Sequence, residues 1–140
     1  RGDLRQRREA ALRALAFFAR FDARLVGPVL EGTADGNSPV ALHLYAEDAE
    51  TVPRFLADHH IPAELRSRRL RLDRERSDDF PVWLFSAEGL TFDLTVLPPS
   101  ALRQAPLSSV DEKPMRRASA AQLRELLAAD EIAGYESIGG

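Results

Sequence analysis

Two side chains capable of acid–base chemistry lie in stretches whose apolar residues alternate. His43 falls within residues 40–46 and Asp93 within residues 90–97. A histidine beside a carboxylate can exchange protons with a substrate, or the two can hold a single metal ion. Asp35, in the loop before the first stretch, is a third candidate for such a site. The alternatives are a histidine hydrogen-bonded in a half-open cleft and an aspartate that is a hydrogen-bonded structural residue or a relic acid.

The elements that must position these side chains follow from hydrophobic periodicity. Apolar residues at helical spacing predict three helices, and alternating or continuous apolar runs bounded by turn residues predict five strands. The connection 87–89 is short enough for a tight turn, so the last two strands are expected to form a hairpin. The predicted helices are residues 3–20, 47–59 and 119–130, and the predicted strands are residues 24–30, 40–46, 63–73, 80–86 and 90–97.

Length and composition restrict the function classes. The chain has 140 residues, which suits a single domain, and its net charge of -3 argues against a general polyanion or nucleic-acid binder. It has no cysteine, which excludes disulfides and thiolate zinc sites and suits a cytoplasmic, soluble protein. No apolar run approaches the ~18 residues that a membrane span needs.

Arginines gather in two places. In the first helix, Arg5, Arg7, Arg8 and Arg13 lie largely off the apolar stripe, which predicts a solvated basic face rather than a nucleic-acid arm. The second group lies between residues 66 and 76, in and after the third strand. We expect an exposed strand whose charges protect a sheet edge, with a phosphate-binding or partner-docking patch as the alternative.

The region around residues 24–47 carries a family resemblance. An apolar strand ends at Gly27, a small-residue turn contains Gly32 and Ala34, and Ser38 and Leu42 open the next strand. This pattern resembles the minimal nucleotidyltransferase domain of the DNA polymerase beta superfamily over roughly residues 10–97. The segment 105–119 resembles uncharacterised bacterial proteins described as nucleotidyltransferase-like. The resemblance implies an α+β fold, a mixed sheet of about five strands backed by helices.

The resemblance also implies where catalytic groups would lie, and this chain departs from it there. Pro39 and Ala41 occupy the positions of the paired metal-binding aspartates, and Asp93 alone matches the third acid. Pro28 stands at the family's serine, where its missing N–H removes a phosphate donor, and Glu31 would repel a triphosphate. Relatives with all three acids hold two divalent metals on the nucleotide phosphates.

We therefore expect a catalytically inactive nucleotidyltransferase-like protein that acts as a binding or assembly module. Its partner would be another protein or a second copy, with no membrane, no metal and no cofactor. The alternative is an active or nucleotide-sensing protein with a site rebuilt around His43 and Asp93, using Mg²⁺ with a nucleotide, and with Gly27, Gly32 and Ser38 as a relic nucleotide-binding loop. The whole chain is expected to be one domain, with a core at 10–97, a connector and helix at 98–130, and a frayed tail at 131–140.

Overall fold

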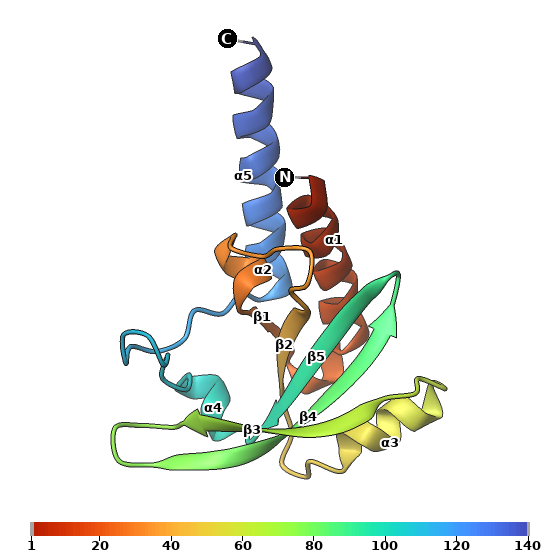
Figure 1. Cartoon of the computed structure of the whole chain (residues 1–140), viewed down its shortest axis with the longest axis vertical. Helices are drawn as coiled ribbons and strands as arrows, with labels where there is room; N and C mark the ends of the chain where they lie inside the picture. The colour runs from red at the N-terminus through yellow and green to blue at the C-terminus, as the bar shows by residue number, and fades with distance from the viewer. Residues whose placement is uncertain (1, 140) are drawn as a thin grey trace.

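The computed structural model describes residues 2–139, and the side chains of residues 3–134 (Figure 1). The protein is α+β, with a mixed sheet backed by helices. Its helices are α1 (Gly2–Phe17), α2 (Pro28–Glu31), α3 (Thr51–Asp58), α4 (Ser100–Arg103) and α5 (Ala120–Gly139), with a 3-10 turn, η1 (Ala19–Phe21). Its strands are β1 (Arg24–Val26), β2 (Val40–Tyr45), β3 (Glu64–Arg71), β4 (Ser77–Ala87) and β5 (Leu90–Leu97).

Within residues 2–139 the strands form one five-stranded sheet in the order β1-β2-β5-β4-β3. β2 and β5 run parallel, and the other neighbouring pairs are antiparallel. The parallel register sets Ala41 beside Asp93 and His43 beside Thr95. Because directly paired residues point to the same side of a sheet, these four side chains share one face.

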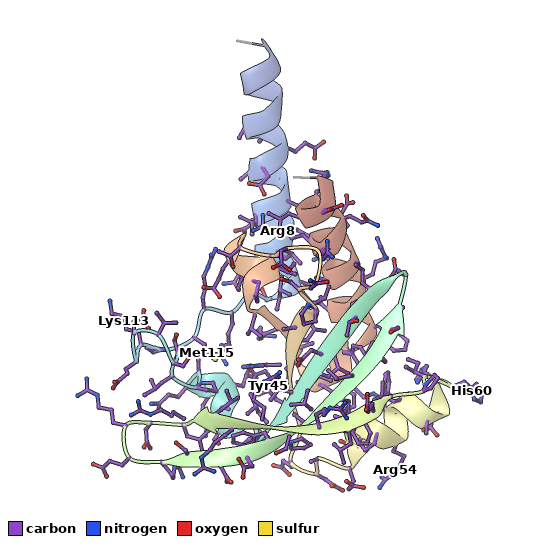
Figure 2. The ribbon with its side chains drawn as sticks, in the orientation of Figure 1. Arg8, Tyr45, Arg54, His60, Lys113 and Met115 are labelled. Atoms are coloured by element: carbon purple, nitrogen blue, oxygen red, sulfur yellow. The ribbon has the colours of Figure 1, made fainter. Side chains whose placement is uncertain are left out.

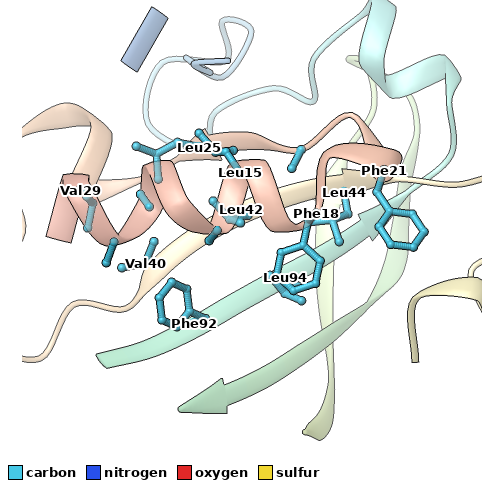
Figure 3. Packing of buried hydrophobic residues seen from close by; sticks show 14 of the residues in the cluster. Leu15, Phe18, Phe21, Leu25, Val29, Val40, Leu42, Leu44, Phe92 and Leu94 are labelled. Atoms are coloured by element: carbon cyan, nitrogen blue, oxygen red, sulfur yellow. The ribbon is translucent and has the colours of Figure 1, made fainter. Parts of the chain in front are cut away.

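The main core lies on the opposite face. Val40, Leu42 and Leu44 of β2 are fully buried there, as the alternation of that strand predicts. They pack with Leu15 of α1 and with Phe18, which directly follows that helix (Figure 3). α1 and α5 lie side by side and antiparallel in Figure 1, and Leu123, Leu126 and Leu127 of α5 join the same cluster, as their helical spacing predicts.

A smaller core forms on the other face, at one end of the sheet. Tyr45, Phe80, Leu97 and Ala101 are buried together where α4 and the following connector fold against the strands. β4 is therefore covered on both sides: Trp83 and Phe85 belong with the main cluster, whereas Phe80 joins the smaller one. The sequence left open whether Trp83 and Phe85 or the opposite pair, Val82 and Leu84, face the core.

The hairpin between β4 and β5 closes through Glu88 and Gly89, as the short connection predicts. Both residues have positive φ, 57° and 75°, and Ala87 pairs with Leu90 across the turn. Two successive left-handed residues fit a two-residue hairpin loop whose twist matches that of the strands.

Several predicted boundaries were wrong. The strand expected at 80–86 begins at Ser77, and the helix expected at 3–20 ends at Phe17, before the 3-10 turn η1. The strand expected at 24–30 stops at Val26, because Gly27 takes φ 77° and Pro28 begins α2, where its missing N–H costs nothing. The helix expected at 47–59 begins at Thr51. α5 continues to Gly139 through most of the segment predicted to be a frayed tail; residue 140 lies outside the described residues.

The solvated basic face predicted for α1 was also wrong for two arginines. Arg7 and Arg8 are 9% and 6% exposed. Arg8 donates to the carbonyl oxygens of Val29 (2.9 Å) and Leu30 (2.9 Å), at the end of α2. A long side chain with several donors can be buried when it meets carbonyls that would otherwise lack partners, and sequence periodicity does not reveal such carbonyls.

Candidate polar site on the sheet

The polar site lies on the sheet face away from α1, along the parallel strands β2 and β5. Ala41 and His43 come from β2, and Asp93 and Thr95 come from β5. The sequence candidates His43 and Asp93 therefore lie on the same face of neighbouring strands. His43 is 2% exposed and Asp93 is 5% exposed, so both are buried polar groups that need compensation.

Asp93 receives its compensation from Arg68 of β3. The Arg68 guanidinium donates to Oδ1 and Oδ2 of Asp93, both at 2.8 Å, and Nη1 also donates to Oγ1 of Thr95 at 2.8 Å. Two parallel bonds between guanidinium and carboxylate are a strong and directional arrangement. The bond to Asp93 also raises the pKa of Arg68 above its ordinary value. Both carboxylate oxygens are thus already engaged by a fixed cation.

Arg68 reaches Asp93 from a strand that does not pair with β5, since β4 lies between β3 and β5. The register places Arg68 beside Phe80 on β4, so its side chain crosses β4 to reach β5. The alternation of residues 63–73 indicated that Arg68 could share a face with other arginines. It did not indicate the strand order, so this partner of Asp93 was missed.

His43 has a different environment. Its Nδ1 is buried and has no hydrogen-bond partner in the part of the chain that the structure describes. The pKa of His43 is lowered from 6.5 to about 4, chiefly by burial. The positive charges of Arg68 and Arg117 also lower it, and together they outweigh the charge of Asp93, which raises it. The ring is therefore neutral near pH 7. No hydrogen bond joins His43 to Asp93 among the described side chains, so the acid–base pair considered for these two residues is not formed in this arrangement.

A second arginine closes the end of this face. Arg117 donates to Oη of Tyr45 (2.9 Å) and to the carbonyl oxygens of Ala101 (2.7 Å) and Leu102 (2.8 Å). Figure 2 shows Tyr45 between the sheet and α4. Burial raises the pKa of Tyr45, while the bond from Arg117 opposes that shift. Arg117 thus ties the connector and α4 to the end of β2, a role that the sequence did not indicate.

The loop residues proposed as a nucleotide-binding relic are spread over the α2 segment. Gly27 lies at the start of α2, and a Cβ added to it would be 3.6 Å from Cβ of Ala41. Gly32 lies at the other end of α2, beside Arg8. Ser38 accepts a bond from the backbone N–H of Asp35 at 3.0 Å and donates to its carboxylate at 3.2 Å. Gly27 is therefore the member of this set that lies beside the polar site.

Asp35 is exposed and is engaged within its own loop. The backbone N–H of Asn37 donates to Oδ1 at 2.8 Å. This bond, and the one from the Ser38 hydroxyl, lower the pKa of Asp35. An aspartate that bonds the backbone two residues ahead stabilises a turn, which accounts for Asp35 without a catalytic role.

The arginines between residues 66 and 76 are mostly paired. β3 is an edge strand of the described sheet, as predicted, and its side chains are largely exposed. Because these arginines pair with acids, most of the positive charge at this edge is neutralised, and little remains to bind an anion. The pairs are Arg66–Glu64, Arg68–Asp93, Arg69–Asp79, Arg71–Glu112 and Arg76–Asp73.

Among the side chains of residues 3–134, no three His, Cys, Asp or Glu residues come together in a group able to hold a metal ion. None of the helices within residues 2–139 combines the length and apolar composition needed to cross a membrane. The fold and the site define an α+β protein with a half-buried arginine–aspartate pair on a mixed sheet. No family model, curated protein or solved structure matches the chain.

Proposed function

We propose that this chain is a catalytically inactive protein of the nucleotidyltransferase-like class that works as a binding or assembly module. The observation that carries the proposal is the bond pattern of Asp93, whose two carboxylate oxygens both accept from Arg68. The resemblance places the third metal-binding acid at Asp93. In this chain a protein cation stands against that acid.

The residue beside Asp93 supports the same proposal. Ala41 pairs directly with Asp93 across β2 and β5, and the resemblance places the second acid of the metal pair at Ala41. A methyl group offers no ligand, whereas two-metal phosphoryl chemistry depends on carboxylates that hold both ions. The parallel pairing of β2 with β5 is the arrangement that would bring those acids together, which supports the proposal of a site that has lost its metal ligands.

A non-catalytic role leaves the surface of the fold as its functional part. The proposed partner is another protein or a second copy of the chain, in the cytoplasm, the location that the cysteine-free sequence suits. Nucleic acid is disfavoured because the net charge is -3 and the arginines of the sheet edge are mostly paired with acids.

A second candidate function is nucleotide sensing, or activity at a rebuilt site. The observation that favours it is the buried Nδ1 of His43, which has no partner among the described residues. A neutral imidazole could accept a proton from, or donate one to, a ligand group in that position. This second candidate function requires that the ion pair between Arg68 and Asp93 breaks, or that Arg68 itself contacts the ligand.

Thermal melting against a panel of nucleotides, each with Mg²⁺, Mn²⁺ or chelator, distinguishes the two. A ligand at ~100 times its dissociation constant adds roughly 2.7 kcal/mol to stability, a shift of several degrees for a domain of this size. The binding-module proposal predicts no metal-dependent shift and no nucleotide transfer. A metal-dependent shift with one nucleotide, lost in both His43→Ala and Asp93→Ala but kept in the exposed-pair variant Arg69→Ala, would replace it with the second candidate.

A further inference from the structure

On the helix-covered face of the sheet, away from His43 and Asp93, a cavity of about 290 Å³ lies between α1 and the β4–β5 hairpin. It exists because small side chains meet where these elements cross. Ala10 and Ala14 face it from α1, and Ala87 faces it from the end of β4. Ala10 is 1% exposed and Ala14 is 8% exposed, so the floor of the cavity belongs to the protein interior.

Aromatic rings form its walls. Phe85 and Phe92 stack nearly parallel, at 8° and 5.1 Å between centroids, on the sheet side. Phe17 and Phe18 meet edge to face at 4.9 Å on the α1 side. Phe17 is 43% exposed, which is unusual for so large an apolar side chain beside a core. Phe18 also meets Phe85, with 6.1 Å between the ring centroids, so the rings form one continuous apolar surface. Such a surface suits a flat apolar guest, since aromatic groups prefer stacked and edge-to-face contacts.

The cavity has one charged pair at its mouth. Arg13 of α1 pairs with Glu88 of the hairpin turn, and both belong to the lining. Their side chains are 59% and 48% exposed, so the pair is solvated and easily exchanged for another partner. The carboxylate of Glu88 therefore marks a position at which Arg13 already donates to an anionic oxygen.

The lining of this space is mainly apolar, and its two charged side chains bond to each other at the rim. The cavity is near the lower end of the ~300–1,000 Å³ range of small-molecule sites, most of which are apolar with a few polar groups that fix orientation. Size, lining and rim charge together describe a site for a small molecule.

We propose that this cavity binds a small planar aromatic carboxylate, with its ring system against the surface of the phenylalanines and its carboxylate on Arg13. In the bound state the ligand's carboxylate replaces that of Glu88, which turns to solvent on its exposed turn. The site lies on the other face of the sheet from the polar site, so it does not depend on the function proposed above.

The first test is titration with naphthalene-2-carboxylate, with the uncharged naphthalene-2-carboxamide as the matched ligand. A dissociation constant of about 1 mM or tighter is expected for a ligand of this size at modest efficiency. Glu88→Gln should tighten the carboxylate about threefold by removing its competitor, and Arg13→Gln should weaken it about threefold, consistent with exposed ion pairs. Neither variant should move the affinity for the carboxamide.

The second test fills the cavity. Ala14→Leu should weaken both ligands at least about tenfold, while Ala57→Leu, at an exposed position of α3, should leave them unchanged. If Ala14→Leu does not fold, Ala87→Val serves in its place. Absence of saturable binding, or binding that these variants leave unchanged, would overturn the proposal. So would a concentration-dependent dimer that Ala14→Leu abolishes, because a second copy would then be the occupant.

Discussion

Arg68 and Asp93 form the ion pair on which the polar face of the sheet depends. The Asp93 side chain is 7% exposed, whereas that of Arg68 is 41% exposed. We expect Arg68→Ala to lower the free energy of unfolding by about 2 kcal/mol, because a buried carboxylate loses its cation and the Thr95 hydroxyl loses its donor. Urea unfolding of the variant and the wild type measures this loss.

The neighbouring residue provides the control for that prediction. Arg69 pairs with Asp79 on the other side of β3, and both side chains are more than half exposed. Arg69→Ala is expected to cost less than about 0.5 kcal/mol, the ordinary value of a solvated pair. Equal losses in the two variants would show that the bonds to Asp93 contribute no more than a surface contact does.

His43 predicts a dependence of stability on pH. Its pKa is about 4 in the folded protein, against 6.5 when unfolded. Above pH 6.5 both states hold a neutral ring, so the shift contributes nothing to the pH dependence. Below 6.5 the unfolded state takes up the proton and the folded state does not, so the free energy of unfolding falls as pH drops, by about 3 kcal/mol by the time pH reaches 4. Urea unfolding between pH 7 and 4 measures this.

A substitution separates the contribution of His43 to this pH dependence from the contributions of acids that titrate in the same range. His43→Gln should remove this part of the pH dependence, so that the variant and the wild type converge as pH falls. His60→Asn is the control, because His60 is exposed at the end of α3 and has φ 58°, which asparagine tolerates. A wild-type curve that stays parallel to that of His43→Gln would contradict the prediction.

At the scale of the elements, the start of α5 depends on a reciprocal cap. The backbone N–H of Gln122 donates to Oγ of Ser119 at 3.2 Å, and that of Ser119 donates to Oε1 of Gln122 at 2.8 Å. Ser119→Ala should cost about 1 kcal/mol, while Ser119→Asp, which keeps an acceptor, should cost much less. Thermal unfolding measures both, and equal losses would show that the cap does not stabilise the helix.

The sequence predicted those elements whose signal is local. Leu90–Leu97 was predicted with its observed bounds, because its alternation is strict and turn residues flank it. The beginning of α2 was missed because the periodicity of a short apolar run does not distinguish a strand from a helix. The bond from Arg68 to Asp93 was missed for another reason: it depends on which strands are neighbours, and β4 separates the two residues in the sheet.

At the scale of the whole molecule, the two faces of one sheet carry different chemistry. One face holds the charged groups of the polar site, and the other meets α1 across aromatic and aliphatic side chains. Helices α1 and α5, which pack in the main core together with α3, come from the two ends of the chain (Figure 1). Their mutual position therefore depends on contacts between residues far apart in the sequence.

Arg8 supplies such a contact, and its removal should weaken the whole fold. Its Nη1 donates to Asp130 of α5 at 2.8 Å, while its other nitrogens satisfy the last carbonyls of α2. We expect Arg8→Leu to lower the free energy of unfolding by about 3 kcal/mol, because buried carbonyls lose their donors and α1 loses its tie to α5. Arg5→Leu is the control, since Arg5 lies on the same helix and its side chain is 45% exposed; its loss should be below about 0.5 kcal/mol. Urea unfolding followed by circular dichroism measures both, and a small loss for Arg8→Leu would mean that Arg8 contributes little to holding α5 against α1.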